Sequence, residues 1–144
     1  MTIQFDREWR AFQISDVTTN SSTKLFTVPA GKEWLVQSVR LAYTTNATVG
    51  TRQIELRYLD GSDNVVSESI AGTTQAASLT RTYTCLLNGL DSVTFRDSSY
   101  LSVVLPHLIL PSGYKLRCLD NKAIAPSGTG ENLLARLLVL ERNV

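Results

Sequence analysis

The chain has 144 residues and a formal net charge of +1, so it is long enough for one domain with its own core. Hydrophobic residues make up 43 % and charged residues 19 %, which excludes a disordered chain, because disorder requires low hydrophobicity and high net charge. The near-neutral balance also argues against dedicated nucleic-acid binding, which needs a cluster of basic side chains. Threonine favours strands, whereas serine and asparagine favour turns, so the composition indicates an all-β protein.

The first residues predict an arm followed by a short strand. We expect residues 1–7 to form an N-terminal arm and residues 8–144 to form a single β-sandwich domain. Residues 8–14 alternate in the manner of a strand, with Trp9 and Phe12 on opposite faces. A terminal segment that is apolar on both faces needs another chain to cover it.

A longer strand is predicted over residues 33–45, after a turn at Pro29-Ala30-Gly31. One face of this strand carries Leu35, Val39, Leu41 and Tyr43, and the other carries Trp34 and Val36. Apolar side chains on both faces indicate that the start of this strand is covered on both sides or lies at a subunit contact.

The clearest alternation is in residues 51–59, where Ile54, Leu56 and Tyr58 share one face. Gln53, Glu55 and Arg57 share the other, so the segment is predicted to be a half-buried antiparallel strand. Turn residues follow at positions 60–64, and residues 65–70 resume an extended pattern. This arrangement predicts a β-hairpin.

The C-terminal third contains one mobile loop and one ambiguous segment. Residues 121–130 are rich in serine, glycine and proline and are predicted to form a mobile loop. Leucine spacing in residues 131–142 fits either an amphipathic helix or a strand. We favour the strand because the other predicted elements of the chain are strands.

The complete pattern predicts an all-β fold, a single antiparallel β-sandwich of jelly-roll type with about eight to nine strands. The predicted strands are residues 8–14, 24–28, 33–45, 51–59, 65–70, 79–87, 100–105, 114–119 and 131–142. We expect Cys85 and Cys118 to be buried thiols rather than a disulfide.

No set of residues predicts catalysis. The only histidine, His107, lies between Pro106 and Leu108, and we interpret it as a surface residue rather than a general base. The carboxylate pairs Asp60 with Asp63, and Asp91 with Asp97, lie in turns, where aspartate bonds to the backbone. A calcium site at Asp60, Asp63 and Asn64 is a weaker alternative. We therefore expect no enzyme activity, no catalytic residue, no metal and no cofactor.

Aromatic side chains indicate a binding surface. Trp9, Phe12, Trp34 and Tyr100 are candidates for a sugar platform or a protein contact, although Trp34 and Tyr100 also fit an ordinary core. The predicted subunit or partner interface comprises Phe5, Trp9, Arg10, Phe12 and Trp34.

Three stretches carry a family resemblance that spans roughly residues 25–142. They are Val-Pro-Ala-Gly-Lys-Glu-Trp at 28–34, Gly-Thr-Arg-Gln-Ile-Glu-Leu-Arg-Tyr-Leu-Asp at 50–60 and Leu-Pro-Ser-Gly-Tyr-Lys-Leu-Arg-Cys-Leu-Asp at 110–120. The sequence resembles small β-sandwich virion proteins of tailed bacteriophages. These motifs are turns and strands, so they carry no catalytic residue.

The resemblance implies a capsid decoration (cement) protein. Such a protein would be made in the host bacterial cytoplasm and bind the major capsid protein on the capsid surface. It would assemble with itself as a homo-oligomer, expected to be a trimer, and would bind neither nucleic acid nor membrane. A neck or tail accessory and a host- or carbohydrate-binding fibre module are the alternatives.

Overall fold

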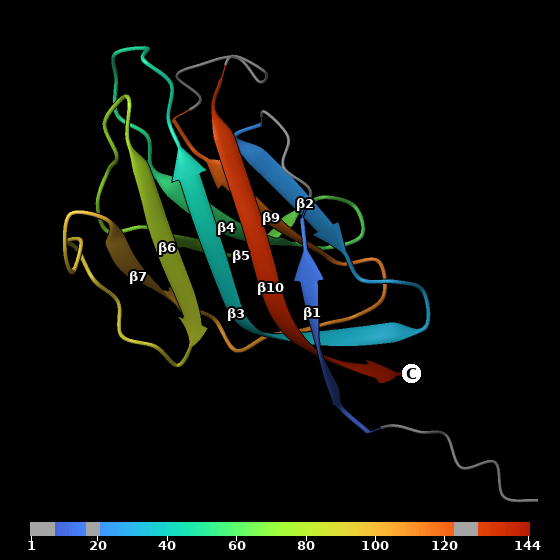
Figure 1. Cartoon of the computed structure of the whole chain (residues 1–144). Coiled ribbons are helices and arrows are strands. Elements are labelled where there is room, and N and C mark those ends of the chain that lie inside the picture. The colour runs from blue at the N-terminus through green and yellow to red at the C-terminus, as the bar shows by residue number, and fades with distance from the viewer. Residues whose placement is uncertain (1–7, 17–20, 123–129) are drawn as a thin grey trace, which may run out of the picture.

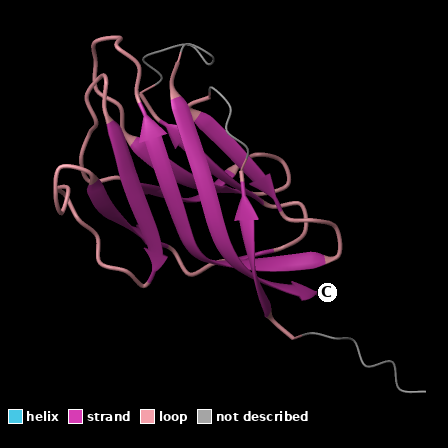
Figure 2. Cartoon of the chain, in the orientation of Figure 1, coloured by secondary structure: helices cyan, strands magenta, loops and turns pink. Residues whose placement is uncertain are grey.

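The computed structural model describes residues 8–16, 21–122 and 130–144, which form ten strands in two sheets (Figure 1). Sheet A contains β1 (Arg10–Ser15), β10 (Asn132–Asn143), β3 (Lys32–Thr44), β6 (Thr80–Leu87) and β7 (Tyr100–Leu105) in that order, with β8 (Ile109–Leu110) paired to the start of β3. Sheet B contains β2 (Thr23–Thr27), β9 (Lys115–Asp120), β4 (Ile54–Leu59) and β5 (Val65–Ile70) in that order. The described residues contain strands and loops but no helix (Figure 2). The predicted arm and most of the predicted mobile loop lie outside the described residues.

The strand order confirms the predicted jelly roll. Without β7 and β8, eight strands remain, of which β9 is the seventh and β10 the eighth. Sheet A then has the order first, eighth, third, sixth, and sheet B has the order second, seventh, fourth, fifth. This interleaving of two antiparallel sheets is the jelly-roll arrangement. The additional strands β7 and β8 are an insertion beside β6 and β3.

One pair of strands differs from the antiparallel prediction. β6 and β7 run parallel, with Thr82 beside Tyr100 and Leu87 beside Leu105. Parallel neighbours need a crossover connection rather than a tight turn. Residues 88–99 supply that long connection, so the Asn88-Gly89 turn does not close a hairpin.

The C-terminal segment is a strand, which confirms the preferred alternative. β10 pairs with β1 on one side and with β3 on the other. Its core side is Leu133, Ala135, Leu137 and Val139, all buried, whereas Leu138 on the opposite face is exposed. Leucines on both faces produced the helix-like spacing in the sequence.

A β-bulge corrects the predicted faces of the strand over residues 33–45. Val139 of β10 pairs with Val36, whereas Leu138 pairs with Ser38, so Gln37 is an extra residue in β3. The bulge reverses the alternation, and Trp34 and Val36 therefore face the same core as Val39. Leu35, predicted to share a face with Val39, lies instead on the outer face, partly exposed and paired with Ile109.

The two Pro-x-Gly turns lie beside each other. The backbone nitrogen of Val28 donates to the carbonyl oxygen of Tyr114 over 2.9 Å, and that of Gly113 donates to the carbonyl oxygen of Val28 over 3.0 Å. Gly31 and Gly113 have φ angles of 72° and 82°, a conformation that glycine adopts without a steric penalty. The sequence motifs at 28–34 and 110–120 are therefore in direct backbone contact.

The two cysteines are free, buried thiols on opposite sheets, as expected from the sequence. Burial raises the pKa of both Cys85 and Cys118, which disfavours the reactive thiolate. We therefore expect no reaction with Ellman's reagent in the native protein and full reaction of both thiols in guanidinium chloride. Rapid labelling of either thiol in buffer would show that the sandwich opens locally.

Candidate functional site

Four of the five predicted interface residues gather where β1, β3 and β10 meet. The rings of Phe12 and Trp34 are 6.3 Å apart in an edge-to-face contact, and the Trp34 Nε1 donates a hydrogen bond to Glu141. The Arg142 guanidinium lies 4.6 Å from the centre of the Trp9 ring. We name Trp9, Arg10, Phe12 and Trp34 the aromatic corner. Phe5 lies outside the described residues.

Within the aromatic corner, the residues differ in their access to a partner. Phe12 is 39 % exposed, whereas Trp34 is only 4 % exposed and belongs to the core. Arg10 is exposed and Trp9 is partly exposed. A second chain would therefore meet Trp9, Arg10 and Phe12 directly, and Trp34 would hold Phe12 in place.

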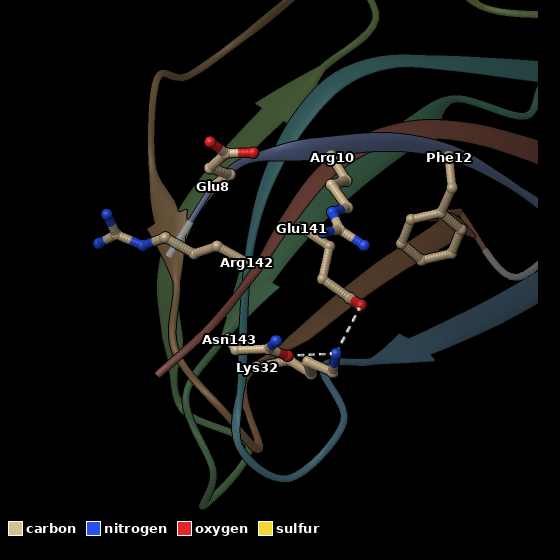
Figure 3. Close-up of a pocket in the computed structure, with 7 residues that line it drawn as sticks. All are labelled: Glu8, Arg10, Phe12, Lys32, Glu141, Arg142 and Asn143. Atoms are coloured by element: carbon tan, nitrogen blue, oxygen red, sulfur yellow. Dashed lines mark hydrogen bonds and ion pairs between the residues drawn. The ribbon is translucent and has the colours of Figure 1, made fainter. Parts of the chain in front are cut away.

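A pocket of about 150 Å³ opens at the aromatic corner (Figure 3). It is lined by Glu8, Arg10, Phe12, Lys32, Glu141, Arg142 and Asn143. The Lys32 ammonium lies 3.2 Å from a Glu141 carboxylate oxygen and also bonds to the Asn143 amide oxygen. The pocket is smaller than typical small-molecule sites, and its lysine is already paired.

The outer face of sheet A forms a second candidate surface. Because Val39, Leu41 and Tyr43 are buried in the core, the intervening side chains of β3 point outward. The same alternation in the neighbouring strands gives a surface that we name the open face. Its members are Gln13 of β1, Leu134, Arg136 and Leu138 of β10, Ser38, Arg40, Ala42 and Thr44 of β3, and Thr80, Thr82, Thr84 and Leu86 of β6.

The open face carries only two charged side chains among these residues, Arg40 and Arg136. They are directly opposite each other in the pairing of β3 with β10. Both are exposed, and neither has a hydrogen bond or ion pair within the part of the chain that the structure describes. Like charges on opposite strand positions repel each other, so this arrangement is locally unfavourable for the isolated chain.

Two depressions hollow this face. One, of about 270 Å³, is lined by Gln13, Ser38, Arg40, Arg136, Leu137 and Leu138. The other, of about 350 Å³, is lined by Thr84, Leu86, Arg96, Asp97, Tyr100, Leu101 and Ser102. They adjoin across the pairing of β3 with β6, where Arg40 is opposite Thr84 and Ser38 is opposite Leu86.

The outer face of sheet B also exposes Leu25 and Ile70, but it carries more charged side chains, and these are paired. Lys115 lies 2.7 Å from an Asp63 carboxylate oxygen, and Arg57 is paired with Glu55 and Glu68. Most of these charges lie at the surface and neutralise each other, which is typical of a solvated face. This difference in charge pairing makes the open face the better candidate for a binding surface.

A buried polar network, which the sequence analysis did not identify, lies around the β3–β4 connection. The Arg52 Nε is 2.7 Å from a Glu131 oxygen, and its Nη atoms donate to Thr48, Gly50 and Asn46. Arg52 has the same parity as Ile54 in the predicted strand, and a charge on an apolar face was the signal that could have revealed it.

The network continues through Tyr43, whose hydroxyl lies 2.7 Å from Glu131 and 3.3 Å from Asp120. Burial, together with these two carboxylates, raises the pKa of the Tyr43 phenol, so the hydroxyl remains a donor. Asp120 also accepts hydrogen bonds from the backbone nitrogens of Gln53 and Lys122. These groups are satisfied by one another, so the network anchors loops rather than presenting a reactive group.

The remaining polar candidates are turn or surface residues. Asp60 accepts bonds from the backbone nitrogens of Ser62 and Asn64, which is the turn geometry predicted for it. His107 is exposed in the connection between β7 and β8. Among the described residues, no three histidine, cysteine or acidic side chains cluster as metal ligands would.

No protein-family model matches the chain, and no curated protein matches it either. The described residues also contain no helix with the length and apolar character to cross a membrane.

Proposed function

We propose that the chain is a non-enzymatic structural protein of a tailed-bacteriophage virion, a decoration protein that binds the major capsid protein. The observation that carries the proposal is the open face. Apart from Arg40 and Arg136, its twelve named residues are uncharged, and most of them are threonine, leucine or alanine. The centres of protein interfaces are depleted of charged residues in the same way.

The proposed mechanism is mechanical. The open face covers the capsid surface, and the aromatic corner contacts a second copy of the chain in a homo-oligomer, expected to be a trimer. Partly exposed Trp9 and Phe12 suit this second contact because aromatic side chains supply much of the energy of interfaces. Each bound copy buries surface on neighbouring capsid subunits and raises the free energy needed to separate them.

Purified capsid shells of the encoding phage provide the test. We expect the chain to co-sediment with shells in many copies, to appear as an oligomer in native mass spectrometry and to raise the temperature at which shells release their DNA. A stable monomer that neither binds shells nor occurs in virions would overturn the proposal. A few copies per particle would point to a neck or tail position.

The depression beside Tyr100 favours the carbohydrate-binding alternative. An exposed aromatic ring beside Arg96 and Asp97 resembles the combination of apolar and hydrogen-bonding groups used for sugars. Binding on a glycan array that is lost in Tyr100→Ala would favour this alternative over capsid decoration.

A further inference from the structure

The paired arginines of the open face lack the carboxylate partners of the other cross-strand arginine pair in the described residues. Arg57 and Arg117 are also opposite each other in sheet B, but Glu55, Glu68 and Asp63 form ion pairs with them. Arg40 and Arg136 line one depression from adjacent strands, and no described carboxylate neutralises them. By contrast, Arg142 lies 2.7 Å from Glu33, with which it is paired across the same two strands. In β10, Arg142 is therefore opposite an acidic residue, whereas Arg136 is opposite a second arginine.

The depression supplies more than charge. Gln13 and Ser38 add hydrogen-bonding groups to its lining, and Leu138 adds an exposed apolar wall. A guanidinium group binds a carboxylate through two parallel hydrogen bonds, and two adjacent guanidinium groups offer several donors to the same acid. An acidic group bound here would also remove the repulsion between the two cations.

We propose that Arg40 and Arg136 receive acidic side chains of the protein that covers the open face. This inference rests on the proposed function, because it assumes that the open face binds protein. A nucleic acid would need a track of cations that follows its phosphates. The face instead continues from Arg40 into Thr84 and Thr82 on β6 and into Leu134 and Leu138 on β10. The charge and the apolar surroundings together fit an acidic patch on a protein.

The first experiment measures binding of an octaglutamate peptide by isothermal titration. We expect Arg40→Gln with Arg136→Gln to weaken this binding by about tenfold for each lost charge-assisted contact. Arg117→Gln on the outer face of sheet B is the control for loss of an arginine that already lies beside a carboxylate, Asp63, and it should bind as the parent does. Inorganic phosphate and a short thymidine oligonucleotide should bind more weakly than the peptide. Equal peptide binding by the double variant, or a preference for phosphate or the oligonucleotide, would overturn the inference.

A second pair of measurements separates binding from folding. Arg40→Glu places a carboxylate opposite Arg136, so we expect a higher Tm together with weaker binding to the peptide and to capsid shells. If the substitution merely destabilised the fold, both the Tm and the binding would decrease. If the double glutamine variant loses the peptide but still binds shells, the inference fails and the proposed function stands. If the unmodified chain binds the peptide but not shells, the proposed function fails.

Discussion

Replacing Arg52 with methionine is expected to lower the free energy of unfolding by about 3–5 kcal/mol, because Glu131 would remain buried without its cation. Arg52 is 0 % exposed and Glu131 is 2 % exposed, so water has little access to the carboxylate. The substitution also removes the donors that bind the carbonyl oxygens of Thr48 and Gly50. Urea denaturation followed by circular dichroism measures the loss.

The double variant Arg52→Met with Glu131→Gln is the control for this prediction. A neutral glutamine needs no cation and can still accept the hydrogen bond from the Tyr43 hydroxyl, so we expect the double variant to regain part of the lost stability. A loss below about 1 kcal/mol in Arg52→Met would contradict the prediction, because it would show that this buried ion pair stabilises the fold no more than an exposed one. A double variant less stable than Arg52→Met would also contradict it.

The predictable part of the fold follows from side-chain periodicity. Residues 54–58 alternate, and the structure buries Ile54, Leu56 and Tyr58 as expected, although it also buries Glu55 on the other face. The preference for a strand over residues 131–142 was confirmed, because the segment fills the place between β1 and β3 in sheet A. Apolar and polar residues alternate in the sequence of a strand whenever one of its faces is buried and the other is exposed.

Features that depend on pairing could not be predicted. The bulge at Gln37 is defined only by the partner residues in β10, and the parallel pairing of β7 depends on the path of residues 88–99. The same limit applies to the candidate site. Arg40 and Arg136 are 96 positions apart in the sequence and become neighbours only through the register of β3 with β10. The sequence drew attention to aromatic residues instead, because their types alone suggest binding.

Replacing Trp34 with alanine tests whether this residue stabilises the core or an interface. We expect the substitution to destabilise the chain by about 3–5 kcal/mol. The ring is buried, packs against Phe12, and its Nε1 lies 2.8 Å from a Glu141 oxygen. Trp34→Phe keeps an aromatic ring and should lose about 1–2 kcal/mol with the hydrogen bond. Chemical denaturation of each variant measures these losses.

Trp9→Ala is the matched control from the same aromatic corner. Trp9 is partly exposed and its main described contact is the Arg142 guanidinium, so we expect a loss of about 0.5–1 kcal/mol. The two variants should also differ in fluorescence, because Trp9→Ala retains the buried Trp34 and its blue-shifted emission. If Trp34 served the interface as the sequence suggested, Trp34→Phe would weaken oligomer formation without changing the unfolding of the single chain. If it serves the core, Trp34→Ala lowers stability at every protein concentration, and Trp9→Ala is the variant expected to weaken the proposed homo-oligomer.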